Sequence, residues 1–369
     1  MAMKRCKECL LPENYPGITF NDEGVCNYCL KHKKRVYYGE EELKKVIESS
    51  LNKTGNYDCI VGISGGRDSA YTLYYLVKVC NLRVLAYMED NGFIPEQVKL
   101  NVKNMTDILG VNLIIEEHNL LKKCIKHIIK SWIRKPSPAM IGFLCLGCKF
   151  AIDRGLFKTA KKYKTPLIIT GASGIEGLSF KRKLLEIKLN SKRKNLSFVY
   201  GLLSEIIKNP FYILSPTCLI TCIREYTFHY PPFFIISPSP SKIRKIIYPN
   251  LKIIFLFDYI EWNEEELLST IKDKLKWEKY THSESTWRSD CKVSLLKDYL
   301  FLETIGFTKK DDQLSEMIRE NMINREEAME RLKKENVIPQ QVITELFDEL
   351  QLNFSDLLVA LKKCKGKEK

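Results

Sequence analysis

The sequence predicts an α/β fold in which helices cover both faces of a parallel sheet, with a cysteine-rich module before it and a helical region after it. Residues 57–180 alternate short β-branched runs with helix-period segments, the pattern of such a sheet. Residues 1–35 contain two Cys-x-x-Cys pairs, and charged segments of helical periodicity follow residue 258. We therefore divide the 369 residues into four parts, 1–35, 36–180, 181–257 and 258–369.

Four cysteines near the start have the spacing of a tetrahedral metal site. Cys6 and Cys9 form one pair, and Cys26 and Cys29 form a second pair further on. Four thiolates leave no open coordination position, so the spacing predicts a structural zinc ion in a ribbon-like module. The chain has 13 cysteines in all, and in a reducing compartment this number favours metal or redox chemistry over disulfides.

The central part contains one entry helix and four strands. The amphipathic segment 39–53 predicts the helix, and the predicted strands are 57–63, 82–88, 111–117 and 165–171. Ligands of parallel sheets bind beyond the carboxyl ends of the strands. Three strand ends have the composition of such a site, namely 64–69, 88–93 and 169–174. We expect these three segments to converge.

The first of these strand ends, Ser-Gly-Gly-Arg-Asp-Ser at 64–69, also opens a predicted helix. The N–H groups of a helix N-terminus attract anions, and the glycines let the backbone approach a phosphate closely. The spacing is neither that of a Walker loop nor that of the Gly-x-Gly-x-x-Gly dinucleotide fingerprint. We predict a phosphate site of another kind. The alternative is a strand-to-helix turn whose glycines serve packing alone.

This segment resembles the pyrophosphate loop of the ATP pyrophosphatase (PP-loop) superfamily, whose Rossmann-like enzymes cleave ATP between its α and β phosphates and adenylate an acceptor. The resemblance implies that pyrophosphate and its Mg²⁺ are held by Ser64, Gly65, Gly66, Asp68 and Ser69. It implies catalytic roles for Asp68 and Arg67. Arg67 stands where the superfamily usually has lysine, so a planar guanidinium group replaces the ammonium group. It places AMP near Asp90, Asn91, Gly92 and Gly171. Asp90 and Asn91 suit an ordinary βα loop equally well.

The cysteine module, the loop and the C-terminal segments together resemble the N-acetyl sugar amidotransferases of that superfamily. The likeness covers residues 1–180 and 258–350. It implies an enzyme that adenylates the N-acetyl group of a nucleotide-linked sugar, releases AMP and pyrophosphate, and installs an ammonia-derived nitrogen to give an acetamidino sugar. In that family separate glutaminase subunits supply the ammonia. Consistently, none of the five histidines, His32, His118, His127, His229 and His282, has a recognisable glutaminase context.

A second cysteine pair, Cys145 and Cys148, and the distant Cys291 fit a three-thiolate site with one open coordination position. Such a site holds zinc or an Fe–S cluster, for example a [4Fe-4S] cluster. Some sulfur-transferring PP-loop enzymes carry a cluster on a similar set, and others use two cysteines as persulfide carrier and resolver. The alternative functions are therefore a thiolase of tRNA or of a small molecule, and a non-catalytic nucleotide-binding module. Cys222 is a rival third ligand, and simple packing is the remaining interpretation.

Composition adds expectations about partners and location. The net charge of +14, from 59 Lys+Arg and 45 Asp+Glu, favours tRNA, nucleotide sugars or an acidic protein as partner, unless it reflects only a lysine-rich composition. The apolar runs 233–236 and 253–257 are far shorter than the ~18 residues of a membrane span, and no signal peptide is recognisable, so we expect a cytoplasmic protein. Residues 181–257 predict an irregular insert of undefined topology.

Overall fold

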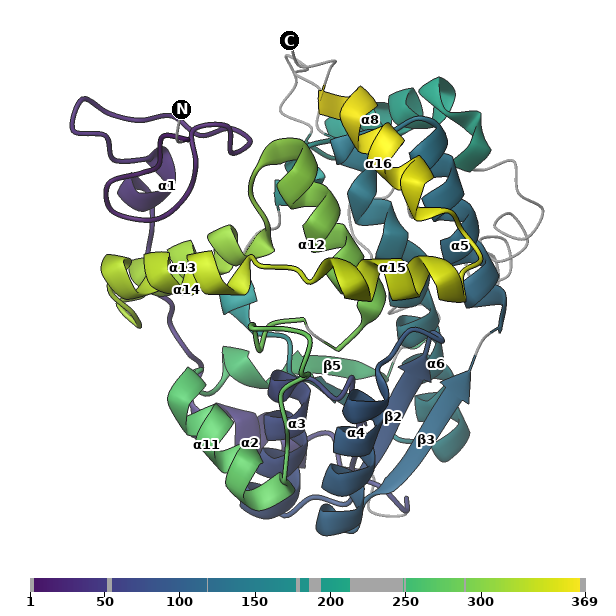
Figure 1. Cartoon of the computed structure of the whole chain (residues 1–369). Helices are drawn as coiled ribbons and strands as arrows, with labels where there is room; N and C mark the ends of the chain where they lie inside the picture. The colour runs from purple at the N-terminus through teal and green to yellow at the C-terminus, as the bar shows by residue number, and fades with distance from the viewer. Residues whose placement is uncertain are drawn as a thin grey trace.

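A five-stranded, fully parallel sheet forms the centre of the molecule (Figure 1). The computed structural model describes residues 3–51, 55–117, 119–176, 180–185, 194–212, 248, 250–288 and 290–365. The strands are β1 (Cys59–Gly62), β2 (Val84–Asp90), β3 (Asn112–Glu117), β4 (Leu167–Thr170) and β5 (Lys252–Phe255). They lie in the order β3-β2-β1-β4-β5. The four strands predicted from the sequence, and the parallel sheet, are therefore confirmed.

The fifth strand is the main difference from the prediction. β5 falls in the segment 181–257, which was expected to be irregular, yet it pairs with β4 from Leu167↔Lys252 to Thr170↔Phe255. A short apolar run cannot be assigned from periodicity, and its place at the sheet edge depends on pairing with a distant strand. Of the expected insert, residues 186–193, 213–247 and 249 lie outside the described residues.

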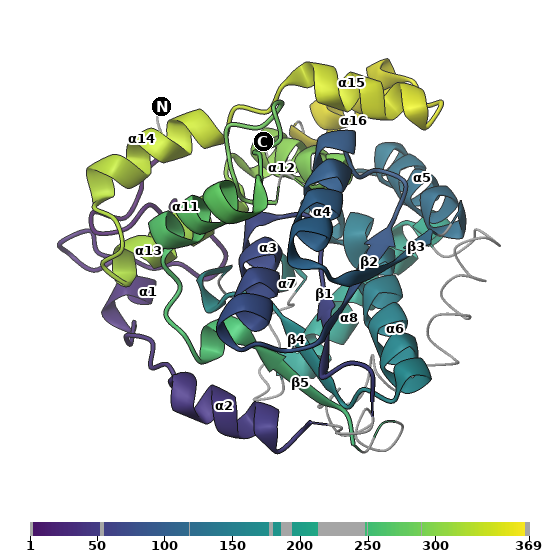
Figure 2. The same ribbon diagram turned by 90° about the horizontal axis from the view of Figure 1, so that it is seen from below.

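Alternating side chains of the strands contribute to two separate cores. On β1, Cys59 and Val61 point to one face, and Ile60 points to the other. The helices of the first core include α2 (Glu40–Glu48), α3 (Arg67–Tyr74), α4 (Glu96–Leu109) and α11 (Glu264–Leu275), and the helical segments 309–319 and 325–335 also contribute to it. A π-helical turn, η1 (Tyr75–Val79), continues α3. The opposite face packs against α6 (Leu146–Tyr163), and Figure 2 shows the sheet between α3 and α6.

A second group of helices lies over the carboxyl edge of the sheet (Figure 1). It comprises α5 (Asn119–Arg134), η2 (Pro138–Cys145), α12 (Lys292–Ile305), α15 (Gln340–Glu349) and α16 (Phe354–Lys365). The first turn of α12 is joined to the end of β2, because the N–H of Lys292 donates to the carbonyl of Phe93 at 3.0 Å. Two further helices, α13 (Lys309–Arg319) and α14 (Arg325–Glu335), extend towards the N-terminal module. The predicted helical C-terminal region is confirmed.

The N-terminal module docks on α13. It contains the short helix α1 (Asn27–Leu30) and two antiparallel bridges, Arg5 to Pro12 and Phe20 to Cys26. The N–H of Leu10 donates to Ser315 Oγ at 3.0 Å, and the hydroxyl of Tyr15 donates to Asp312 Oδ1 at 2.8 Å. The module therefore packs on the C-terminal region, and its Leu10 also joins the core on the first face of the sheet.

Short elements complete the described chain. They are η3 (Gly174–Glu176), α7 (Phe180–Lys183), α8 (Lys194–Lys208), η4 (Pro210–Tyr212) and η6 (Leu256–Asp258). Within the described residues, no helix combines the length and the apolar character needed to cross a lipid bilayer.

Candidate active site

The loop between β1 and α3 lies where the strand order reverses, between β1 and β4. In sheets of this kind that reversal opens the crevice in which ligands bind. Three hydrogen bonds hold the loop. Ser64 N–H donates to Ser69 Oγ at 3.2 Å, Gly66 N–H donates to Ser64 Oγ at 3.3 Å, and Ser69 Oγ donates to the Gly66 carbonyl at 2.9 Å. The serine hydroxyls therefore shape the loop, and Ser64 remains exposed.

Two glycines are required by close approaches at this crevice. Gly65 has a φ of +78°, and a Cβ on it would lie 2.8 Å from the carbonyl oxygen of Val98 on α4. Gly171 follows β4, and a Cβ on it would lie 2.6 Å from the carbonyl oxygen of Asp68. Real Cβ atoms do not approach backbone so closely. The ends of β1 and β4 thus meet at the first turn of α3, as the sequence predicted.

Indole groups from the C-terminal part cover this loop. Trp277 Nε1 donates to the carbonyl of Gly65 at 2.9 Å, and Trp262 Nε1 donates to Asp68 Oδ1 at 2.9 Å. Both tryptophans are buried. The loop backbone and its aspartate are therefore positioned by a part of the chain that lies almost two hundred residues further on.

Arg67 is enclosed by the same cover. Its guanidinium carbon lies 3.8 Å from the ring centroid of Trp287 and 5.1 Å from that of Trp262. Its Nη1 donates to Glu264 and, at 2.5 Å, to Thr286 Oγ1. Only 2% of the residue is exposed. The side chain thus joins the loop to its cover, and its predicted catalytic role is not tested by this arrangement.

Glu264 balances the charge of Arg67. It also accepts from Arg331 Nη1 of α14 at 2.7 Å. Burial opposes ionisation of this carboxyl, but the two guanidinium groups outweigh burial and lower the pKa of Glu264. An ionised Glu264 therefore links α11, α14 and the loop.

Asp290 also faces the loop. Its Oδ2 lies 3.2 Å from the position that a Cβ on Gly66 would occupy. The sequence pattern predicted a site residue at Cys291 in the segment Ser-Asp-Cys and did not predict a role for Asp290. The available signal was a carboxylate directly beside a predicted site cysteine.

The end of β2 supplies two residues with separate tasks. Asp90 accepts from the N–H of Gly92 at 2.8 Å and pairs with Lys99 Nζ of α4 at 2.9 Å. Asn91 Oδ1 accepts from the N–H of Phe93 at 2.9 Å. These bonds fix the turn after β2. Both side chains are buried, and their contact with AMP remains a prediction.

The amide nitrogen of Asn91 brings two of the predicted cysteines together. It donates to Cys148 Sγ at 3.5 Å and to Cys291 Sγ at 3.4 Å. Burial and the nearby Cys145 raise the pKa of Cys291 to about 11, and burial with both other sulfurs raises that of Cys148. Lys297 of α12 is hydrogen-bonded to Cys145. The three cysteines therefore converge beside the end of β2.

Their spacing is wider than that of a closed single-ion site. One ion with thiolate bonds of about 2.3 Å requires sulfurs less than about 4.6 Å apart. Among the described residues, two groups of three or more ligand-type side chains have all ligand atoms within 4.8 Å, and the trio Cys145, Cys148 and Cys291 is not one of them. Cys222, the rival third ligand, lies outside the described residues, as do His118 and His229.

The four N-terminal cysteines are the first of those groups. Their sulfur separations are 3.9 Å for Cys6–Cys29, 3.7 Å for Cys9–Cys26 and 3.6 Å for Cys26–Cys29. Four sulfurs about 2.3 Å from one ion lie about 3.8 Å apart in a tetrahedron. The residues therefore fit a tetrahedral four-thiolate metal site, as predicted.

The second group, His32, Glu316 and Glu320, is an ion-pair network. His32 Nε2 lies 2.8 Å from Glu320 Oε1, and Arg35 and Arg319 both lie 2.8 Å or less from Glu316. Two guanidinium groups beside the carboxylates disfavour a further cation. This network joins the N-terminal module to α13.

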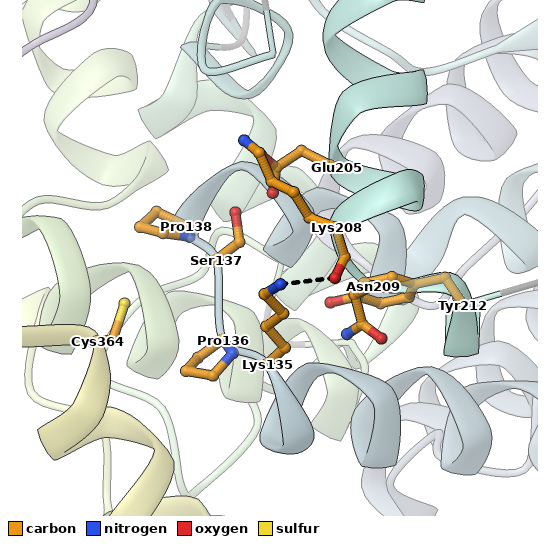
Figure 3. Close-up of a pocket in the computed structure, with 9 residues that line it drawn as sticks. All are labelled: Lys135, Pro136, Ser137, Pro138, Glu205, Lys208, Asn209, Tyr212 and Cys364. Carbon is orange, nitrogen blue, oxygen red and sulfur yellow. Dashed lines mark hydrogen bonds and ion pairs between the residues drawn. The ribbon is translucent and has the colours of Figure 1, made fainter. Parts of the chain in front are cut away.

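A cavity of about 220 Å³ lies elsewhere, between the end of α5, η4 and α16 (Figure 3). Its lining includes Tyr212 and Cys364, and Lys135 Nζ crosses it to donate to the carbonyl of Lys208 at 2.7 Å. None of the predicted site residues lines it.

The chain therefore has a parallel α/β sheet with the Ser-Gly-Gly-Arg-Asp-Ser loop at its point of reversal and a four-cysteine module near its start, as the sequence predicted. Residues 276–367 match the family described as LPS biosynthesis protein WbpG-like, C-terminal domain. The chain is 22% identical over 335 residues to the uncharacterized protein MJ1599 of Methanocaldococcus jannaschii, covering 89% of this chain and 92% of that protein.

Two solved structures are similar to this chain at lower sequence identity. NMN synthetase from Francisella tularensis is 12% identical, with 79% of this chain and 89% of that chain covered and a TM-score of 0.37. The U34-tRNA thiolase NcsA from Methanococcus maripaludis, with its [4Fe-4S] cluster, is 16% identical, with 90% and 89% covered and a TM-score of 0.32. The parallel α/β fold follows from the strand order of the sheet itself.

The matched family segment includes the cover of the loop. Trp277, Trp287, Asp290 and Cys291 all lie within residues 276–367. The C-terminal region is therefore part of the candidate site and not a separate appendage.

Proposed function

We propose that this protein is an ATP-dependent amidotransferase that converts the N-acetyl group of a nucleotide-linked sugar into an acetamidino group. One observation carries the proposal: the segment that matches the WbpG-like family supplies Trp277 and Trp287, two of the indole groups that cover the loop. The description of that family as an LPS biosynthesis protein supports a sugar acceptor. A PP-loop supports the use of ATP with release of AMP and pyrophosphate.

The reaction has two displacements. The acetamide oxygen attacks the α phosphorus of ATP, and pyrophosphate leaves. Ammonia then adds to the activated carbon, and AMP departs with the former amide oxygen. Each step needs orientation and neutralisation of phosphate charge.

Loop residues have matching roles in this proposal. The backbone and hydroxyls of Ser64, Gly65, Gly66 and Ser69 hold pyrophosphate at the start of α3. Asp68 holds Mg²⁺, which neutralises phosphate charge when bound. Arg67 is a positioning residue, because its charge is already paired with Glu264 and stacked on Trp287. Asn91, Gly92 and Gly171 border AMP, and Asp90 holds the turn through Lys99.

We further propose a structural zinc ion on Cys6, Cys9, Cys26 and Cys29. Their sulfur spacing supports this choice, and thiolate ligation with closed tetrahedral geometry is typical of zinc. Ammonia reaches the enzyme from a separate glutaminase partner, as in the family that the sequence resembles.

A thiolase is the second candidate, and the convergence of Cys145, Cys148 and Cys291 on Asn91 favours it. In that case the trio carries a persulfide or holds an Fe–S cluster. The acceptor oxygen, on tRNA or a small molecule, is replaced by sulfur instead of nitrogen.

Mass spectrometry separates the two functions. UDP-linked N-acetyl sugars are incubated with the enzyme and ATP, with ammonium in one reaction and sulfide in a parallel one, and the masses of the products are measured. Replacing oxygen by NH lowers the acceptor mass by about one unit, whereas replacing it by sulfur raises the mass by about sixteen. We expect the decrease, with AMP and pyrophosphate in equal amounts. Formation of ADP, or no change in any acceptor, would contradict the amidotransferase.

An Asp68→Ala variant tests the loop in the same assay. Loss of the carboxylate should abolish Mg²⁺-dependent release of pyrophosphate while the protein remains folded, with a lower melting temperature because Trp262 Nε1 loses its acceptor. Normal pyrophosphate release by this variant would remove the loop assignment.

A further inference from the structure

The carboxylate of Asp290 lies beside Gly66 of the loop. Its Oδ2 and the hydroxyl oxygen of Ser64 both lie 3.2 Å from the position of a Cβ on Gly66, and the Asp290 carboxyl carbon lies 3.8 Å from it. Ser64 belongs to the predicted pyrophosphate cradle. Asp290 therefore faces the same volume that a phosphate would enter.

Other acidic side chains of the candidate site form ion pairs with basic side chains, whereas Asp290 does not within the described residues. Glu264 is paired with Arg67 and Arg331, and Asp90 is paired with Lys99. Within the described part of the chain, no hydrogen bond or ion pair engages the side chain of Asp290, which is half-buried. A half-buried carboxylate beside a loop built for anions repels those anions unless a cation lies between them.

The backbone around Asp290 is anchored on its C-terminal side. Cys291 Sγ accepts from Asn91 Nδ2 at 3.4 Å, and Lys292 N–H donates to the carbonyl of Phe93 at 3.0 Å. Both bonds tie the segment to the turn after β2. The backbone on this side of Asp290 is thus held in place by the chain itself.

We propose that Asp290 is a ligand of the Mg²⁺ that accompanies ATP at the loop, acting with Asp68. This inference rests on the proposed use of ATP. Mg²⁺ in proteins is commonly held by one or two carboxylates together with substrate phosphates, and Asp68 of the loop with Asp290 beside Gly66 would supply two. The C-terminal region then supplies a metal ligand as well as the aromatic cover of the loop.

The direct test measures metal binding without turnover. Mn²⁺ replaces Mg²⁺, the non-hydrolysable analogue α,β-methylene-ATP occupies the loop, and free Mn²⁺ is counted by electron paramagnetic resonance. Asp290→Asn should weaken Mn²⁺ binding in this complex by about tenfold or more, because one charged ligand is lost. The matched control is Glu284→Gln, an exposed acid of the same segment that pairs with Lys279. The control should bind Mn²⁺ like the unmodified protein.

Equal Mn²⁺ affinity of Asp290→Asn and the unmodified protein would overturn the proposal. If Asp290→Asn melts early, Asp290→Ser serves as the second variant under the same criterion. The protein could bind Mn²⁺ and the analogue in an Asp290-dependent manner and yet amidinate no sugar. That result would support Asp290 as a metal ligand and contradict the proposed function. The two failures are therefore distinguishable.

Discussion

Arg67 of the loop is stacked on Trp287 of the C-terminal region, with 3.8 Å between the guanidinium carbon and the ring centroid. The same guanidinium donates to Glu264 and Thr286. A residue that sequence comparison assigns to phosphate chemistry is therefore built into the contact between two regions of the chain. This geometry supports the proposal that Arg67 positions the loop and does not itself contact phosphate.

Arg67→Lys should lower stability although lysine is usual at this position in the PP-loop enzymes that the segment resembles. The ammonium cannot reproduce the planar stack together with two hydrogen bonds from one group. We expect a loss of about 1 to 2 kcal/mol in the free energy of unfolding, measured with denaturant. Arg83→Lys is the control, because Arg83 is half-exposed and pairs with Asp58 on the surface. Unchanged stability of Arg67→Lys would contradict the positioning role.

The loop was predictable from sequence because its determinants are local. Ser64, Gly65, Gly66 and Ser69 are adjacent in the chain, and the preceding strand and following helix have clear periodicity. The metal-ligand spacing of Cys6 to Cys29 is local as well. Such features need no knowledge of distant contacts.

The cover of the loop was not predictable in this way. Trp277 and Gly65 are 212 positions apart, and nothing in either segment indicates that the indole will reach that carbonyl. The approach of Asp290 to Gly66 is likewise a contact between distant segments, which the local sequence does not indicate. The strand β5 depends on pairing with β4 across a long connection, so a short apolar run could not identify it.

Cys26→Ser should release the metal of the N-terminal module. Binding free energy of a structural metal is folding free energy, so the melting temperature should fall together with the metal content. Metal analysis of the purified protein should find one zinc per chain in the unmodified form. Cys80→Ser, at a cysteine away from the module, should retain it. Absence of zinc from the unmodified protein would contradict the assignment.

Asp312 should make stability depend on pH in a direction opposite to most carboxylates. Burial raises its pKa from 3.8 to about 6, although the Tyr15 hydroxyl bond opposes the rise. The folded state then favours the protonated form, so the contribution of Asp312 is fully present below about pH 4 and is lost as the pH rises through about 6.

Asp312→Asn isolates this contribution, because asparagine still accepts the hydrogen bond from Tyr15. The free energy of unfolding of the variant minus that of the unmodified protein should increase by about 3 kcal/mol between pH 4 and pH 8. A flat difference for Asp312→Asn would show that the buried carboxyl is ionised throughout.

Cys148→Ser separates a packing role of the cysteine trio from a chemical one. The proposed amidotransferase takes its nitrogen from ammonia and transfers no sulfur, so the variant should form the same product, about one mass unit lighter than the acceptor. Serine Oγ can still accept from Asn91 Nδ2, so the rate should fall by no more than about tenfold. Cys124→Ser, at a buried cysteine of α5, controls for general damage to the core. If Cys148→Ser still releases pyrophosphate in the presence of acceptor but forms no product, the trio takes part in the transfer step. A thiolated product from the unmodified protein, lost in this variant, would replace the amidotransferase by the thiolase.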